Sequence, residues 1–217
     1  MSEKYQNSER DWNVYYTAVK DNPPRETLIS ALDLFENEGA ESEKMFATDL
    51  GCGSGRDTYE LLKRGWNVYA TDKEKSAIDI LLKNLPGKYS HKLKTKISAF
   101  ENIEIPEANL INASYSLPFC LPAHFENLWM KIEKAVKTGG RFSGVFFGMN
   151  DEWTKYTDMN FIEKEKIDSL FENFTIEYFH ERDEDGETAI GVKKHWHVYS
   201  VIAKKKHNEI KGWNNLA

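Results

Sequence analysis

A glycine-rich segment between an apolar run and a helical pattern constrains the fold of this chain more than any other feature. The segment is Asp49-Leu50-Gly51-Cys52-Gly53-Ser54-Gly55-Arg56-Asp57. Residues 45–48 before it predict a strand, and residues 58–63 after it predict a helix. Glycine adopts backbone angles that a Cβ forbids, so a ligand can approach bare backbone beside the positive end of the helix dipole. The pattern is typical of a nucleotide-binding turn.

Three charged residues around the loop indicate which nucleotide it binds. The spacing is G-x-G-x-G, and Arg56 stands where the dinucleotide fingerprint has its third glycine. Asp49, directly before the loop, would repel a pyrophosphate but attract a ligand that carries an ammonium and a sulfonium. Asp72 ends the next apolar run, residues 66–71, where it can accept both hydroxyls of a ribose. S-adenosylmethionine has all of these groups.

The order of apolar runs and helical patterns predicts the fold class. Helices are predicted over 8–20, 25–38, 55–64, 75–85, 122–137 and 161–171, and strands over 45–50, 66–71, 92–97, 108–113, 140–147, 174–180 and 193–203. Lys137-Thr138-Gly139-Gly140 predicts a helix C-cap, and the charged segment 182–187 predicts a hairpin turn. Strands that alternate with helices favour a parallel sheet covered on both faces, and the last two strands favour an antiparallel hairpin.

On the residues from Asp49 to Gly55 and on Asp72, the chain resembles the class I S-adenosylmethionine-dependent methyltransferases. The pattern of Trp12, Tyr15-Tyr16 and Pro23-Pro24-Arg25 is similar to the start of small-molecule methyltransferases of the tellurite-resistance type. The resemblance implies a Rossmann-like doubly wound α/β sheet, mostly parallel with a C-terminal antiparallel hairpin, and N-terminal helices that form a lid. It also implies S-adenosyl-L-methionine as cofactor and S-adenosyl-L-homocysteine as product.

Composition bounds the remaining classes. The chain of 217 residues is predicted to form one methyltransferase domain, 1–217, with a helical lid at 1–40 and a loose tail at 204–217 to which Trp213 belongs. A net charge of −6 disfavours nucleic-acid binding. Two cysteines, Cys52 and Cys120, give no disulfide framework and no metal site. Without a signal-peptide core or a long apolar stretch, the chain is expected to be cytoplasmic, away from membranes, and a monomer or homodimer.

The resemblance assigns cofactor contacts to the segments that follow the predicted strands, and to the lid. In an open parallel sheet, ligands bind outside the carboxyl ends of the strands. The residues predicted to bind the cofactor are Asp49, Gly51, Cys52, Gly53, Gly55, Asp72, Lys73, Ala99, Phe100, Ser114, Tyr115, Arg25, Tyr16 and Trp12. Ala99 stands where the family often has an acid that contacts the adenine. In the lid, Trp12 and Tyr16 can cover a sulfonium by cation–π attraction, and Arg25 can bind the carboxylate of the cofactor.

The sequence shows no obvious catalytic dyad. Tyr115 and His197 are the candidates for catalysis, and His195 and His197 lie on one face of the last strand, as a base, as an incomplete metal pair or as strand residues. Phe119, Leu121, Pro122 and Trp153 are candidate walls of an acceptor pocket. The favoured hypothesis is in-line methyl transfer to a small molecule. A catalytically silent cofactor-binding module and a protein or RNA methyltransferase remain alternatives.

Overall fold

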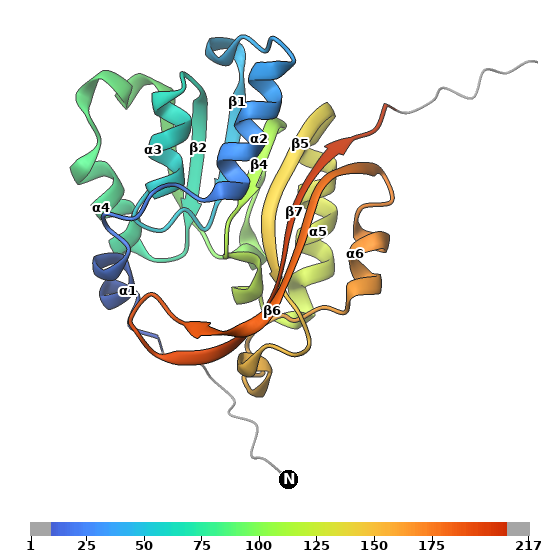
Figure 1. Cartoon of the computed structure of the whole chain (residues 1–217). Helices are drawn as coiled ribbons and strands as arrows, with labels where there is room; N and C mark the ends of the chain where they lie inside the picture. Colours follow the sequence, from blue (N-terminus) through green and yellow to red (C-terminus); the bar gives the residue numbers. More distant parts are fainter. Residues whose placement is uncertain (1–9, 208–217) are drawn as a thin grey trace, which may run out of the picture.

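The computed structural model describes residues 10–207, which form a seven-stranded sheet with helices on both faces (Figure 1). The strand order is β3-β2-β1-β4-β5-β7-β6. The parallel strands are β1 (Phe46–Leu50), β2 (Asn67–Asp72), β3 (Leu93–Ile97), β4 (Ala108–Ala113) and β5 (Val136–Phe147). The antiparallel part comprises β6 (Phe174–Glu187) and β7 (Lys193–Lys205), with β7 paired to β5. The doubly wound, mostly parallel sheet is confirmed.

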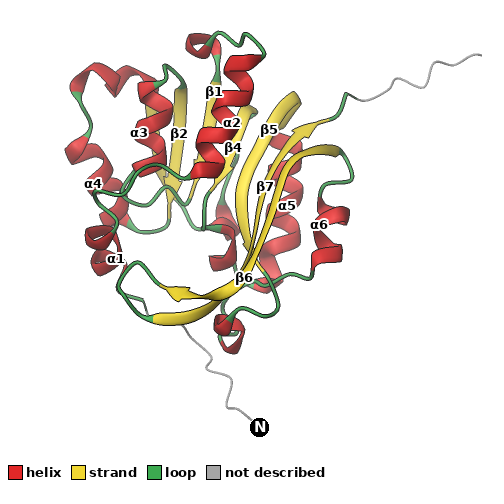
Figure 2. Cartoon of the chain, viewed as in Figure 1, coloured by secondary structure: helices red, strands yellow, loops and turns green. Residues whose placement is uncertain are grey.

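Helices cover the two faces of the sheet in separate groups (Figure 2). One hydrophobic cluster joins the sheet to α2 (Glu26–Asn37), α3 (Arg56–Lys63) and α4 (Lys75–Asn84). The other joins it to α5 (Pro122–Ala135) and α6 (Lys164–Leu170). Because β1 is covered on both sides, four of its five residues are buried, which explains its continuous rather than alternating pattern.

The N-terminal helix is shorter than its pattern predicts. The predicted helix 8–20 corresponds to α1 (Trp12–Ala18), and residues 8 and 9 lie outside the described part of the chain. Asp11 begins the helix, since its side chain accepts hydrogen bonds from the backbone N–H groups of Asn13 and Val14. After the break at Pro23-Pro24, α2 follows the predicted stripe, with Leu28, Ala31, Leu32 and Phe35 buried.

The predicted end of the helix at 122–137 is wrong by two residues. Helix α5 ends at Ala135, and residues 137–140 belong to β5. The pairing of β4 with β5 shifts register between Ala108, opposite Val136, and Leu110, opposite Arg141. The two glycines are therefore part of a strand irregularity rather than a helix cap, and Gly139 has the positive φ of 75° that such a deviation requires.

The predicted hairpin turn at 182–187 is also wrong, because these residues extend β6. Their charged side chains have partners on β7: the two ring nitrogens of His195 lie 2.7 Å from the carboxylates of Asp183 and Asp185. The turn itself is residues 188–192. The longer hairpin curls below the sheet (Figure 1). Its Ile190 lines a small surface hollow together with Val14 of α1. The hairpin tip and the N-terminal helix thus meet beside the carboxyl ends of the parallel strands.

Other expectations fall partly outside the described residues. Residues 204 and 205 of the predicted tail complete β7, whereas 208–217, with Trp213, lie outside the described part. Both cysteines are free and buried. Within residues 10–207, no helix has the length and apolar character needed to cross a membrane, and no three His, Cys, Asp or Glu side chains are grouped to hold a metal ion.

Candidate functional site

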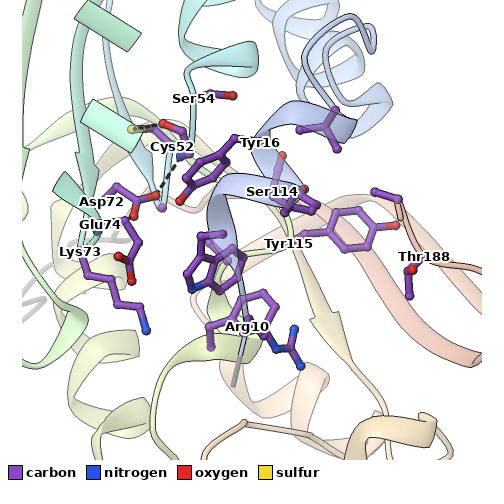
Figure 3. A pocket seen from close by; sticks show the side chains of 18 of the residues that line it. Arg10, Tyr16, Cys52, Ser54, Asp72, Lys73, Glu74, Ser114, Tyr115 and Thr188 are labelled. Carbon is purple, nitrogen blue, oxygen red and sulfur yellow. Dashed lines mark hydrogen bonds between the residues drawn. The ribbon is translucent and has the colours of Figure 1, made fainter. Parts of the chain in front are cut away.

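A cavity of about 1500 Å³ opens at the carboxyl ends of the parallel strands, between α1 and the hairpin tip. Its lining includes the glycine loop, Asp72 after β2, Ser98 to Glu101 after β3 and Ser114 to Ser116 after β4. Figure 3 shows Tyr16 of α1 between Asp72 on one side and Ser114 and Tyr115 on the other. The cavity is therefore assembled from segments that are far apart in the sequence.

The glycine loop has a backbone that other residues adopt poorly. Gly51, Gly53 and Gly55 have φ angles of 67°, 53° and 94°. A Cβ on Gly51 would lie 2.4 Å from the Cβ of Ser116, and one on Gly55 would lie 2.3 Å from Leu81 Cδ1. Gly51 thus lets the β4 loop approach, and Gly55 lets α4 pack against the start of α3. Gly53 faces Tyr16, whose Cε1 would be 3.3 Å from an added Cβ.

Asp72 is fixed at the edge of the cavity by two backbone donors. Its Oδ2 accepts from the N–H of Gly53 at 2.8 Å, and its Oδ1 accepts from the N–H of Glu74 at 2.9 Å. Burial raises the pKa of Asp72, while the two N–H donors oppose that rise. Each carboxylate oxygen has a further lone pair, so Asp72 can still accept hydrogen bonds from two ligand hydroxyls.

Asp49 lies beneath the loop, and both of its oxygens bind neighbouring side chains. The hydroxyl of Thr58 donates to Oδ2 at 2.6 Å, and the amide of Asn112 donates to Oδ1 at 2.9 Å. The same amide nitrogen lies 3.2 Å from Asp57 Oδ2, and the N–H of Arg25 donates to Asp57 Oδ1. Burial, together with Asp57, raises the pKa of Asp49 to about 7. This network ties β1, β4, α3 and the start of α2 together below the cavity.

Helix α1 covers the loop with aromatic rings. Tyr16 is buried, and its ring lies 6.3 Å from that of Trp12 in a stacked arrangement. Trp12 in turn packs edge-on against Phe119, with ring centroids 5.0 Å apart. Burial and the nearby Asp72 raise the pKa of Tyr16, so its hydroxyl stays protonated and can donate a hydrogen bond.

Two guanidinium groups enter the cavity beside the loop. Arg25 lies over the ring of Tyr115, 4.2 Å from its centroid. Arg56, the first residue of α3, has its Nε 3.6 Å from Asp57 Oδ1. The Nε atoms of both arginines are buried without a hydrogen-bond partner among the described residues. Burial and the charge of Arg25 lower the pKa of Arg56. Two adjacent, incompletely paired cations form a site for an anionic group such as a carboxylate.

Tyr115 holds the one positive φ, 55°, found outside glycine in residues 10–207. Tyr115 comes directly after Ser114, the first residue beyond β4, so the strained backbone lies at the carboxyl end of that strand. The hydroxyl of Ser114 donates a hydrogen bond to Asn112 Oδ1. The ring of Tyr115 lies 6.2 Å from that of Phe147 and 6.4 Å from that of Trp196. Tyr115 therefore stands between the loop side of the cavity and an aromatic side.

The structure removes His197 from the acceptor pocket. It does not line the cavity, it is buried, and its Nδ1 accepts from the N–H of Asn150 while its Nε2 contacts Glu181 at 3.1 Å. A Cβ on Gly148 would collide with its ring at 2.3 Å, so the ring is packed against the backbone after β5. These contacts hold His197, one of the two candidates for catalysis, outside the cavity lining.

The remaining predicted residues can be compared with the cavity lining. Gly55 does not line the cavity; it lets α4 pack against the start of α3. Pro122 is the first residue of α5 and does not line the cavity either. The predicted residues that line the cavity are Trp12, Tyr16, Arg25, Asp49, Gly51, Cys52, Gly53, Asp72, Lys73, Ala99, Phe100, Ser114, Tyr115, Phe119, Leu121 and Trp153. Burial and the nearby carboxylates raise the pKa of the Cys52 thiol, so this side chain remains neutral.

The sequence reasoning missed a group of lining residues on the aromatic side. They are Arg10, Phe147, Tyr156, Asp158, Arg182, Glu187, Thr188, Ala189, Ile190, Val192 and Trp196. Most come from the hairpin and from the segment after β5, and their sequence pattern is that of ordinary strand and loop residues. Arg56 was also missed as a ligand residue, although its place at the start of α3 directly after the loop was a usable signal.

Comparison with known proteins identifies a methyltransferase domain within the chain. Residues 47–140 match the profile of the methyltransferase domain family. This match and the fold support a class I S-adenosylmethionine-dependent methyltransferase domain. Its fold is that of TehB from Haemophilus influenzae, with a TM-score of 0.71 at 13% identity over 89% of this chain and 66% of TehB. The resemblance predicted from the glycine loop is confirmed.

Two further proteins are similar to this chain, one in structure and one in sequence. The magnesium protoporphyrin IX methyltransferase from Synechocystis PCC 6803, solved with bound S-adenosylhomocysteine, superposes with a TM-score of 0.67 at 10% identity, covering 90% of this chain and 94% of that one. Carboxy-S-adenosyl-L-methionine synthase from Shewanella piezotolerans is 29% identical over 113 residues, which are 50% of this chain and 46% of that protein. The chain thus spans about half the length of this curated relative.

The residues present in the methyltransferase domain fit S-adenosylmethionine, the cofactor of this class. A backbone cradle that a Cβ would fill lies beside Tyr16, and Asp72 has lone pairs directed to the edge of the cavity. The unpartnered Nε atoms of Arg25 and Arg56 suit the carboxylate at the amino-acid end of the cofactor. Donors, acceptors and open backbone thus occur together where the cofactor needs them.

Proposed function

We propose that this chain transfers the methyl group of S-adenosylmethionine to a small molecule by in-line displacement. One observation carries the proposal: the glycine loop and the aromatic wall are parts of the same cavity of about 1500 Å³. Sites for drug-sized ligands are typically about 300–1,000 Å³, so this volume suits a cofactor together with a second small ligand. A bulky acceptor such as a folded protein would need an open groove instead.

The lining side chains support one orientation of the bound cofactor. Asp72 would hold the ribose, Ala99 and Phe100 would flank the adenine, and Arg25 with Arg56 would hold the carboxylate. In this orientation the methyl group would lie toward Tyr115 and the aromatic side. When bound, the cofactor supplies an activated methyl group, so the protein contributes mainly proximity and alignment.

A methyl-transfer assay tests the proposal. The full chain is incubated with S-adenosylmethionine and a panel of small thiols, carboxylates, phenols, amines and chalcogen oxyanions, and S-adenosylhomocysteine formation is measured. We expect acceptor-dependent product with at least one class and loss of turnover in Asp72→Ala. Cofactor binding without turnover on any acceptor would instead support the catalytically silent module.

A second candidate reaction rests on the paired arginines. The relative from Shewanella piezotolerans is named a synthase of carboxy-S-adenosyl-L-methionine, a molecule with one more carboxylate than the cofactor. Arg25 and Arg56 each keep a buried Nε without a hydrogen-bond partner among the described residues, so two donors are open to carboxylates. Mass spectrometry of the cofactor recovered from the assay, with small carboxylic acids present as carboxyl donors, distinguishes a carboxylated cofactor from S-adenosylhomocysteine.

A further inference from the structure

The part of the cavity away from the glycine loop is walled by aromatic rings from separate segments. They are Tyr115, Phe119, Phe147, Trp153, Tyr156 and Trp196. Trp153 lies 5.9 Å from Phe147 and 5.4 Å from Trp196, measured between ring centroids. Aromatic walls of this kind pack against flat, apolar ligand bodies. The shape of the wall therefore favours an acceptor that contains a ring.

Arg10 brings a positive charge into this wall from the segment before α1. Its guanidinium carbon lies 4.0 Å from the ring centroid of Trp153 and 4.5 Å from that of Phe119. Burial lowers the pKa of Arg10 to about 10, so the group is still a cation at neutral pH. The surrounding rings stabilise a cation that has lost part of its hydration.

The guanidinium of Arg10 retains donors for a ligand. Its hydrogen bond within residues 10–207 goes to the Sδ of Met159 at 2.9 Å. A thioether is a weak acceptor, whereas a guanidinium has five N–H groups. In the same part of the chain no carboxylate lies within 4.0 Å of Arg10, although Asp158 and Asp151 act on it at longer range. An incoming anion would therefore find unsatisfied donors.

The buried carboxylate of Asp151, which also acts on Arg10, is paired with a lysine. Lys194 Nζ binds Asp151 Oδ1 at 2.5 Å, and both side chains are at most 1% exposed. Lys194 also lies 3.8 Å from the ring centroid of Trp153, so Trp153 contacts two cations. On the hairpin side, Arg182 and Glu187 contribute one charge of each sign. Asp158 also lines this side and acts on Arg10 at longer range, so the wall carries charges of both signs, with the Arg10 guanidinium placed among its rings.

We propose that the acceptor is an aromatic anion, a ring that carries an ionised thiol, carboxyl or hydroxyl group, with the ionised group paired to Arg10 and the ring packed against Trp153. This inference rests on the proposed methyl transfer. A lone pair of the ionised group forms the bond to the methyl carbon while the carbon–sulfur bond of the sulfonium breaks and its electron pair stays on sulfur. The two charges cancel, and no proton is removed.

The chemistry of the cavity lining agrees with a nucleophile that is ionised before it binds. Among the lining residues of the described chain none is a histidine, the side chain used most often as a general base. An acceptor that arrives as an anion makes a general base unnecessary. Arg10 is then a specificity residue that selects the ionised acceptor.

The test compares three probes that share one ring and differ in charge. Benzoate, benzamide and benzylammonium are titrated by calorimetry into the full chain saturated with S-adenosylhomocysteine. We expect benzoate to bind at least about tenfold more tightly than benzamide, and benzylammonium to show no saturable binding. Arg10→Gln should lower benzoate affinity about tenfold or more and leave benzamide unchanged, as for the loss of one charged hydrogen bond. Arg10→Lys should recover part of the loss.

The control is Lys166→Gln, which removes one positive charge from α6 outside the cavity lining and should change none of the probes. Benzoate that fails to bind, or that binds Arg10→Gln equally well, overturns the inference. If the chain instead prefers benzylammonium, and Arg10→Gln strengthens that preference, the inference is also overturned. The rings would then form a cage for cations, and the Arg10 guanidinium would occupy the place of a cationic acceptor. Absence of S-adenosylhomocysteine binding would be a failure of the proposed function itself, and it is read out separately before any probe is added.

Discussion

The loop side and the aromatic side of the cavity are built in different ways. The loop side, formed by the glycine loop and Asp72, depends on backbone conformation and on residues within 24 positions of one another, from Asp49 to Asp72. The aromatic side joins Arg10, Phe119, Trp153 and Trp196, which are separated by up to 186 positions. Under the proposed function, a local device would bind the cofactor, whereas side chains that only the finished fold brings together would bind the acceptor.

The largest expected effect concerns the support of the aromatic side. Lys194→Met leaves the buried carboxylate of Asp151 without its cation, so the free energy of unfolding should fall by about 3–5 kcal/mol. Urea denaturation measures the loss. Affinity for S-adenosylhomocysteine at low temperature should remain nearly unchanged, because the loop side does not use this pair.

Lys193→Met is the matched control, since Lys193 is exposed beside the buried Lys194. It should change the stability little. The double variant Lys194→Met with Asp151→Asn should recover part of the loss. Equal losses in the two lysine variants would show that the ion pair does not support the aromatic wall.

The next largest effect is expected from a substitution that displaces the backbone of the glycine loop. Gly51→Ala places a Cβ 2.4 Å from Ser116 Cβ at a φ of 67°, so the loop must move. We expect the affinity for S-adenosylhomocysteine to fall more than about 100-fold, or roughly 2.7 kcal/mol. Gly39→Ala has a similar φ of 75° but meets no atom within 4 Å. It should cost stability only, and a loss of cofactor affinity in both variants would contradict a local role for Gly51.

A smaller loss is expected from the ribose contact. Asp72→Ala removes the acceptor at the cavity edge, and cofactor affinity should fall by about 1.5–3 kcal/mol, the range for hydrogen bonds to a charged group. Calorimetry with S-adenosylhomocysteine measures it. Asp79→Ala on the exposed face of α4, where Asp79 pairs with Lys75, is the control. Unchanged affinity in Asp72→Ala would mean that the ribose lies elsewhere.

The last effect is a pH dependence of stability that belongs to the loop side. Because burial raises the pKa of Asp49 to about 7, the folded protein holds a proton that the unfolded chain has released between about pH 4 and 7. This contribution to stability is therefore lost as the pH rises through that window. Asp49→Asn should flatten the urea stability profile over this range. An identical profile for the variant would show that Asp49 does not titrate there.

The sequence predicts the loop side well for a physical reason. Alternating strands and helices, the glycine spacing and Asp72 are short-range patterns, and the structure places Asp72 against Gly53 as the motif implies. What short-range patterns cannot predict is the pairing of distant residues. The charged stretch 182–187 has the composition of a turn until His195 supplies its cross-strand partner, and His197 looks available until Gly148 packs against it. Arg10 acquires meaning only beside Trp153.

The most direct test of the central claim is calorimetric titration of S-adenosylhomocysteine into the wild-type chain and into Asp72→Ala. If the glycine loop binds the cofactor, the wild-type chain should show one saturable site for S-adenosylhomocysteine. The affinity of Asp72→Ala for the same ligand should be at least about tenfold lower. Absence of saturable binding to the correctly folded wild-type chain would contradict the assignment of the glycine loop as a cofactor site.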